Sequence, residues 1–254
     1  MTAMGSRSPE TTRPSLFWPL AALLIPLISL LAKIRVSGQE NLPRDGAFVL
    51  APNHYSEFDP LIVAVAVWRT GRAPRFMAKE SLFRTPVLGW VLRSTGMVPV
   101  ARSSSASSAR QTMKQSEELV EHGRGVIVYP EGTLTRDPDM WPMRGKSGAV
   151  RLALADDIPL IPMAHWGTQG IMARYQKGIS LWPLRKPVRV VIGEPVDLSD
   201  LRGRAGEPAA LNEATTRLMD AITALLEDLR GEKAPAERWN PASHGQKETG
   251  RLDS

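Results

Sequence analysis

The segment AFVLAPNHYSEFDPLIVAVAVWR, residues 47–69, decides the fold class of this chain. It begins with an apolar run at 47–51, which is typical of a buried strand, and it passes through a polar turn into a helical stretch at 57–69. The same succession of a short apolar run and a longer helical stretch recurs along the chain. Such alternation favours a largely parallel sheet that is covered by helices on both faces.

Seven short apolar runs are the candidate strands, and they lie at 34–38, 47–51, 75–78, 97–101, 126–129, 160–164 and 188–193. Helices are expected between them at 57–69, 86–94, 106–122 and 145–156, with a last helix at about 208–230 that has its leucines on one face. We therefore predict an α/β protein whose mostly parallel sheet of about seven strands is covered by helices on both faces.

The two ends of the chain differ from this pattern. Residues 1–14 are polar and are expected to be a disordered leader, and residues 231–254 lack periodicity and are expected to be a flexible tail. Residues 15–32 carry no charge and are rich in leucine and isoleucine, but they are short for a spanning helix and contain prolines. We predict that 15–33 is a hydrophobic, membrane-anchoring helical segment that enters the bilayer at its interface; the alternative is a buried N-terminal helix of the core.

Composition excludes several classes of function. The 254 residues include no cysteine and only four histidines, so the chain has no disulfide framework, no thiolate zinc site and no cysteine acyl carrier, and we expect no metal. No G-x-S-x-G or G-x-G-x-x-G motif in a suitable context occurs. The net charge of +6 suits nucleic acid, anionic lipid or a phosphorylated substrate. Aromatic residues make up only 6%, which disfavours a nucleic-acid partner.

The polar turn of the opening segment holds a histidine and an aspartate five residues apart, His54 and Asp59. A turn that follows a strand and enters a helix can fold the carboxylate back onto the imidazole. The aspartate would then fix the proton on one ring nitrogen, and the other nitrogen would be free to take a proton from a hydroxyl. The alternative is structural, because Asp59 before Pro60 is also a good helix N-cap and Ser56 with Asp59 makes a capping-box-like pair.

Two later blocks also follow apolar strands. The block YPEGT, residues 129–133, places Glu131 at a strand end, where it can bind a hydroxyl or orient a neighbouring cation. Arg102 ends another strand, and a guanidinium near Glu131 would make a phosphate-binding fork, since arginine binds phosphate with two parallel hydrogen bonds. The alternatives are an ordinary turn and a solvated strand-end charge.

With four blocks in order, the chain resembles the glycerolipid acyltransferases, in particular the 1-acylglycerol-3-phosphate (lysophosphatidic acid) acyltransferases. The blocks are NHYSEFD at 53–59, Arg102, PEGT at 130–133 and IP at 161–162, and the resemblance runs from about 36 to 196. It implies an acyltransferase domain over 34–230. It also implies that His54 is the general base towards the free glycerol hydroxyl and that Asp59 orients it. The substrate-binding residues that it implies are Lys79, Arg102, Glu131, Gly132 and Thr133.

One position departs from the family pattern. The third block usually reads E-G-T-R-S, whereas here Leu134 follows Thr133 and the nearest arginine is Arg136. Arg136 is therefore the candidate to replace the missing guanidinium. The alternatives are an acceptor other than lysophosphatidic acid, or a solvated Arg136 that pairs with Asp137 or Asp139 nearby.

The resemblance implies a complete reaction. A fatty acyl group would move from a thioester, acyl-CoA or acyl carrier protein, to 1-acylglycerol-3-phosphate, and the product would be phosphatidic acid for phospholipid synthesis. No cofactor is expected beyond the thioester co-substrate. The expected partners are membrane lipids, the lysophospholipid acceptor and the acyl donor, at the cytoplasmic face of the cell membrane. The alternatives are acylation of another lysolipid or a glycolipid, or a non-catalytic peripheral lipid-binding protein.

Overall fold

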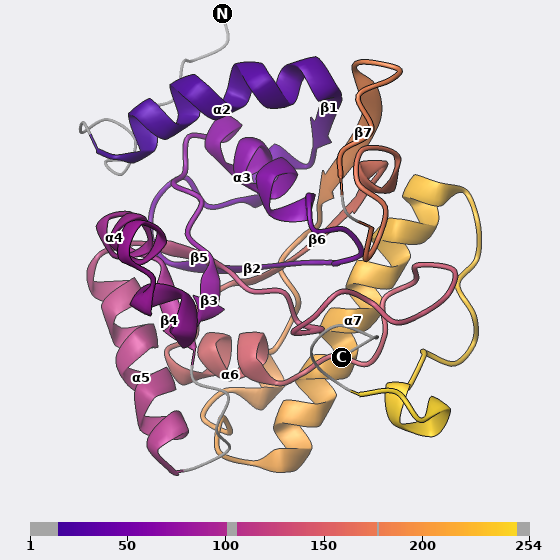
Figure 1. The fold of residues 1–254 in the computed structure, drawn as a ribbon. Helices are drawn as coiled ribbons and strands as arrows, with labels where there is room; N and C mark the ends of the chain where they lie inside the picture. Colours follow the sequence, from indigo (N-terminus) through magenta and orange to yellow (C-terminus); the bar gives the residue numbers. More distant parts are fainter. Residues whose placement is uncertain (1–14, 101–105, 177, 248–254) are drawn as a thin grey trace, which may run out of the picture.

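The computed structural model describes residues 15–100, 106–176 and 178–247 (Figure 1). Its main sheet has five strands in the order β1-β7-β6-β2-β5, and β6 and β7 are its only antiparallel neighbours. The bounds of these strands are β1 Ala32–Ser37, β2 Phe48–Pro52, β5 Gly125–Ile127, β6 Leu160–Trp166 and β7 Lys186–Ile192. The prediction of a mostly parallel α/β sheet is confirmed.

The prediction of a single sheet of about seven strands is wrong, although a strand forms at each of the seven apolar runs. β3 (Met77–Lys79) and β4 (Val98–Val100) make a separate two-stranded parallel sheet. Phe76, just before β3, makes one isolated bridge to Ile127 of β5. From Met77 onward the segment pairs with β4 and no longer with β5, so the ladder of hydrogen bonds is not continuous between the two sheets.

Helices cover both faces of the main sheet, as Figure 1 shows. Alternate residues of β2 point to opposite faces, as the two-residue period of a strand requires. Phe48 and Leu50 join a core cluster with α3 (Asp59–Arg69) and α2 (Phe17–Leu31). Val49 and Ala51 join a second cluster with α6 (Gly148–Ala155) and α7 (Pro208–Arg230). The remaining helices are α4 (Pro86–Ser94) and α5 (Ala106–Glu121).

The N-terminal helix α2 is buried on one side only. Ile28 and Leu31 lie in the core cluster against α3 and β1, which partly meets the alternative of a core helix. Leu23, Leu27 and Leu30 on the other side are 69%, 55% and 57% exposed. Within 15–100, 106–176 and 178–247, no helix has both the length and the apolar character that a membrane crossing needs. Membrane anchoring by this segment stays a prediction.

Residues 231–247 follow α7 and lie against the domain. Gly231 ends α7 with a left-handed backbone (φ 71°), which glycine adopts without a steric penalty. Ala234 then donates a backbone hydrogen bond to the Glu227 carboxylate, and Arg144 donates one to the carbonyl of Trp239. These are contacts of the first part of the segment that composition marked as a tail.

Candidate active site

The turn between β2 and α3 lies at the carboxyl end of β2, the strand between β6 and β5 in the main sheet. Asn53 fixes the start of this turn to the neighbouring strand β6. Its side chain accepts a hydrogen bond from the backbone of His165 (2.9 Å) and donates one to the carbonyl of His165 (3.2 Å). These bonds extend the pairing of β2 with β6 by one residue beyond the ladder, so the next residue, His54, has a defined position.

His54 and Asp59 form a hydrogen-bonded pair. Nδ1 of His54 lies 3.0 Å from Oδ2 of Asp59, and the histidine side chain is 16% exposed while the carboxylate is fully buried. Nε2 of His54 has no hydrogen-bond partner among the described residues. The predicted arrangement, with one nitrogen held by the carboxylate and the other open, is therefore present.

The Asp59 carboxylate points back along the turn rather than capping α3. Its Oδ2 accepts backbone hydrogen bonds from Tyr55 (2.7 Å) and Ser56 (2.8 Å), both of which precede the helix. The N-cap alternative is wrong, because a cap would accept from N–H groups inside the helix. The bond from Ser56 is half of a capping box, so that alternative is partly met. Ser56 Oγ instead accepts from Phe58 N and donates to the carbonyl of Met172.

Two further residues contact Asp59 from the end of β6. The hydroxyl of Thr168 donates to Oδ1 at 2.6 Å, and Nδ1 of His165 lies 3.8 Å from the same oxygen. Burial raises the pKa of Asp59, but His165, the His54 ring and Thr168 outweigh it, so the pKa lies below the ordinary value. Burial lowers the pKa of His165, although the charge of Asp59 acts in the opposite direction. Asp59 is therefore a buried, fully hydrogen-bonded carboxylate, suited to stabilise a protonated His54.

Aromatic rings enclose the histidine pair. The ring of Tyr129 stacks on the His54 imidazole with 4.0 Å between centroids and 23° between planes. Burial raises the pKa of Tyr129 well above its ordinary value, so its hydroxyl stays neutral. The hydroxyl of Tyr55 accepts hydrogen bonds from the backbone of Gly167 and Thr168, which holds the loop after β6 in place. These rings restrict the orientation of His54 and exclude water from one of its faces.

The block after β5 holds the backbone of His54. Oε1 of Glu131 accepts from His54 N at 3.0 Å, and the backbone of Thr135 donates to the carbonyl of His54 at 2.6 Å. Oε2 of Glu131 accepts from Met143 N, also at 3.0 Å. Burial raises the pKa of Glu131 to about 8. Glu131 thus connects the histidine turn to the loop at residue 143, and these backbone partners were not predicted from sequence.

Gly132 and Thr133 form the exposed part of the same turn. Gly132 has a left-handed backbone (φ 69°), and a Cβ there would lie 3.2 Å from Cδ of Lys146 and 3.5 Å from its Nζ. A side chain is therefore disfavoured at this position by both backbone and space. Lys146 is a cation beside the turn that sequence reasoning did not propose. Thr133 is half-buried.

The sequence-predicted cations lie in different surroundings. Arg136 is 1% exposed, and Leu134 beside it is buried as well. Arg174 donates to the carbonyls of Thr135 (2.7 Å) and Asp137 (2.6 Å), on either side of Arg136, and was not predicted from sequence. Lys79 is exposed at the end of β3. Arg102 lies outside the described residues.

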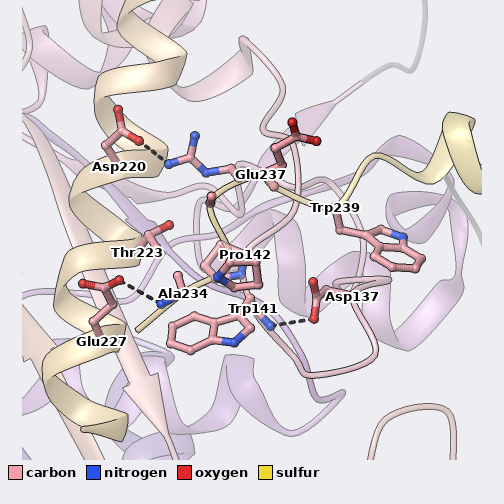
Figure 2. Close-up of a pocket in the computed structure, with 12 residues that line it drawn as sticks. Asp137, Trp141, Pro142, Asp220, Thr223, Glu227, Ala234, Glu237 and Trp239 are labelled. Atoms are coloured by element: carbon pink, nitrogen blue, oxygen red, sulfur yellow. Dashed lines mark hydrogen bonds and ion pairs between the residues drawn. The ribbon is translucent and has the colours of Figure 1, made fainter. Parts of the chain in front are cut away.

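A cavity of about 370 Å³ lies between the loop at 137–142, α7 and the segment after α7 (Figure 2). Its charged lining is mainly acidic, with Asp137, Asp220, Glu227 and Glu237, and its arginine, Arg238, is paired with Asp220. His54 does not line it. An acidic lining repels a phosphate, so this cavity is not the site of the chemistry described above.

Comparison with known proteins finds similar acyltransferases. A 1-acyl-sn-glycerol-3-phosphate acyltransferase, BAT2, chloroplastic, from Brassica napus is 33% identical over 165 residues, and the match covers 65% of this chain but 45% of that protein. A 1-acyl-sn-glycerol-3-phosphate acyltransferase of Bacillus subtilis is 28% identical over 205 residues, 80% of this chain and 94% of that protein. The chain thus spans less than half the length of the Brassica relative.

A solved structure shares the fold. The 1-acyl-sn-glycerophosphate (LPA) acyltransferase PlsC from Thermotoga maritima superposes with a TM-score of 0.59 at 21% identity, over 87% of this chain and 82% of that one. The family model described as Acyltransferase matches residues 33–166, which contain β1, the His54–Asp59 pair, the Glu131 turn and β6. Because this match covers more than half of the chain, the chain belongs to the acyltransferase family.

Proposed function

We propose that this protein transfers a fatty acyl group from a thioester, acyl-CoA or acyl carrier protein, to the free hydroxyl of 1-acylglycerol-3-phosphate, giving phosphatidic acid. The observation that carries the proposal is the pair His54 and Asp59, in which Nδ1 is bound to a buried carboxylate and Nε2 has no partner among the described residues. The named activity of the Brassica and Bacillus relatives supports the choice of acceptor.

The proposed reaction needs one base and no acyl-enzyme. His54 Nε2 takes the proton of the acceptor hydroxyl, and the hydroxyl oxygen attacks the thioester carbonyl carbon. The carbon–sulfur bond breaks as the ester forms, and the leaving sulfur takes the proton back from His54. Asp59 stabilises the positive charge that His54 carries between these two proton transfers. Glu131 and Thr135 keep the His54 backbone in place throughout.

The acceptor phosphate requires cations, and the loop after Glu131 supplies candidates. Arg136 and Arg174 lie together there, since both influence the pKa of the neighbouring Tyr175, which burial raises and the two guanidiniums lower. Guanidinium groups bind phosphate with paired, charge-assisted hydrogen bonds. We assign the phosphate to this pair, with Lys79 and Arg102 as further candidate cations.

The test is a panel of donors and acceptors on the purified protein. Thiol release is followed with a chromogenic reagent while products are identified by mass spectrometry. Release that depends on lysophosphatidic acid and yields phosphatidic acid supports the proposal. His54→Ala should abolish it, whereas His122→Ala, a substitution of an exposed histidine at the end of α5, should not. Release with no acceptor, or with none of the lysolipids, contradicts it.

We also propose that the protein attaches to the cytoplasmic face of the membrane through the exposed side of α2. Leucine side chains that are more than half exposed there favour an apolar surrounding. The double substitution Leu23→Ser, Leu27→Ser should shift the protein from the membrane pellet to the supernatant without unfolding it, because both residues lie on the uncovered side. An unchanged pellet fraction would contradict attachment by α2.

A further inference from the structure

The loop before β7 carries large apolar side chains on its surface. Within GISLWPLR, residues 178–185, Leu181 is 64% exposed, Trp182 82% and Leu184 51%, and Ile179 is 44% exposed. Scattered exposed apolar residues are ordinary, but four within six positions make a contiguous patch, and such patches mark interaction sites.

The same loop is held from the inside. Lys186, which is only 8% exposed, donates from Nζ to the carbonyl of Ser180 (2.8 Å) and to that of Pro183 (2.7 Å). A buried ammonium needs such partners, and here it satisfies the backbone of the loop from within. The apolar side chains are therefore turned outward on a loop that has its own internal hydrogen bonds.

The loop stands next to the uncovered side of α2. The backbone of Arg185 donates to the carbonyl of Leu30, close to the C-terminal end of α2, at 2.9 Å. Figure 1 shows the chain at the start of β7 rising beside that end of the helix. Leu27 and Leu30 are exposed on α2 as Leu181 and Trp182 are on the loop. Two segments about 150 residues apart thus lie next to each other, and each has exposed apolar side chains that can form one apolar surface.

Charge around this surface has one sign. The sequence from 158 to 192 contains five basic residues and no acidic residue, and 11–39 contains three basic residues and no acidic residue. The pairing of β1 with β7 brings these two stretches together. Lys33, Arg35 and Arg185 are exposed beside the leucines. Exposed apolar side chains on two segments that carry basic and no acidic residues are complementary to a bilayer that contains anionic lipid.

The loop is also connected to the histidine turn. The backbone of Ser180 donates to the carbonyl of Ile171 at 2.7 Å, and the next carbonyl, that of Met172, accepts from Ser56 Oγ at 2.7 Å. Ser56 lies between His54 and Asp59. These hydrogen bonds join the apolar loop to the turn that carries His54 and Asp59. A ligand bound at the surface of the loop therefore has a fixed position relative to His54.

We propose that the loop 178–185 is a second membrane-inserting element, which forms one docking surface with α2 for an anionic bilayer. Leu181, Trp182 and Leu184 enter the acyl-chain region, and Arg185 contacts the headgroups. This proposal rests on the proposed function, since its purpose is to supply the acyltransferase with its acceptor. A domain docked in this way would let the acceptor pass directly from the bilayer to His54.

The test is binding of the full chain to sedimenting vesicles, with no acyl donor or acceptor present. Vesicles of phosphatidylcholine with phosphatidylglycerol are compared with vesicles of phosphatidylcholine alone. Trp182→Glu should weaken partitioning to the anionic vesicles by about ten-fold to a hundred-fold, as expected when one large apolar side chain no longer inserts. Trp182→Ala should weaken it in the same direction by less. Raising salt from about 0.1 M to about 0.5 M should weaken wild-type binding.

The matched control is Val120→Glu, which places the same charge at an apolar residue of α5 that is 50% exposed. It should leave partitioning unchanged. Both variants should keep the wild-type melting temperature, since neither side chain is buried. Wild-type partitioning of Trp182→Glu and Trp182→Ala, or an equal loss in Val120→Glu, would overturn the proposal. The proposal would also be overturned if the wild type were a dimer and Trp182→Glu dissociated it without changing vesicle binding. The loop would then be a contact with a second copy of the chain.

Activity separates this proposal from the proposed function. Trp182→Glu should acylate a water-soluble short-chain acceptor at the wild-type rate and should lose rate on an acceptor embedded in vesicles. An equal loss on both would overturn the docking role. A wild type that binds vesicles through Trp182 but acylates neither acceptor would leave the docking surface standing and refute the acyltransferase proposal.

Discussion

Glu131→Gln tests the two backbone hydrogen bonds that Glu131 accepts beside His54, and it changes the shape of the side chain very little. Each carboxylate oxygen of Glu131 accepts one backbone N–H, from His54 and from Met143, and glutamine keeps only one oxygen. Whichever way the amide turns, one buried N–H faces an NH₂ group. Leaving a buried donor unsatisfied costs about 1–3 kcal/mol. The protonated carboxyl keeps acceptor lone pairs on both oxygens, so before ionisation the wild type should be more stable than the variant by up to that amount.

Ionisation of Glu131 reverses the order of stability of the wild type and the variant as pH rises. The carboxyl loses its proton at about pH 8 when folded and near its ordinary 4.5 when unfolded, so the unfolded state binds fewer protons between these values and stability falls as pH rises. At about 1.4 kcal/mol per pH unit, the wild type loses about 3 kcal/mol relative to the variant between pH 5 and pH 8. Glutamine does not titrate. The wild type should therefore be the more stable protein at pH 5 and the less stable one at pH 8.

Urea denaturation at the two pH values measures this difference. The control is Glu57→Gln, a substitution of an exposed glutamate in the same turn, which should stay within about 0.5 kcal/mol of the wild type at both pH values. A wild-type advantage that is the same at pH 5 and pH 8 would show that Glu131 is ionised throughout, and the argument from burial would fail. A variant as stable as the wild type at pH 5 would show that the two backbone bonds contribute little.

His54→Ala should lower kcat by about 10²–10⁴-fold, because it removes the base. The melting temperature should not change, since the side chain is partly exposed, and His54→Gln is the variant to use if the alanine variant does not fold. Asp59→Asn should lower kcat less, since its oxygen still accepts from the turn backbone. Thr168→Val removes a hydroxyl that lowers the pKa of Asp59, so the acidic limb of the pH–rate profile should move to higher pH, while Thr168→Ser should keep it in place. Arg136→Ala should raise the acceptor KM by about ten-fold to a hundred-fold with little change in donor KM, and an unchanged acceptor KM would remove Arg136 from the phosphate site.

Local patterns were enough to predict the helices and the histidine pair. The helices at 86–94 and 208–230 have the predicted bounds, because proline begins each of them and their apolar residues repeat at helical spacing. His54 and Asp59 are five residues apart in one turn, so local spacing was enough to predict that they can meet, although distant segments hold both of them in place.

The rest depends on strand pairing that no local pattern encodes. Thr168 contacts Asp59 across 109 residues because β6 lies beside β2 in one register. A search for polar residues after every predicted strand would have found it, as it follows the strand predicted at 160–164. The two sheets are linked by one isolated bridge at Phe76, and no apolar run predicts that pairing stops there. The partners of Glu131 are backbone groups, which have no sequence signature.

The pairing of β1 with β7 has a consequence for synthesis of the chain. β1 ends at Ser37, yet the one strand that pairs with it among the described residues begins at Lys186. At about 5–20 residues per second, the ribosome needs about 8–30 s to make the intervening part. During that time α2 and its partner α3 have emerged, but the sheet edge that β1 forms with β7 is still missing, so apolar surface of α2 and β1 is left uncovered and can meet a bilayer. Ribosome-bound chains that stop before 186 should then be cut by protease near β1 unless vesicles are present; equal protection without vesicles would refute this order.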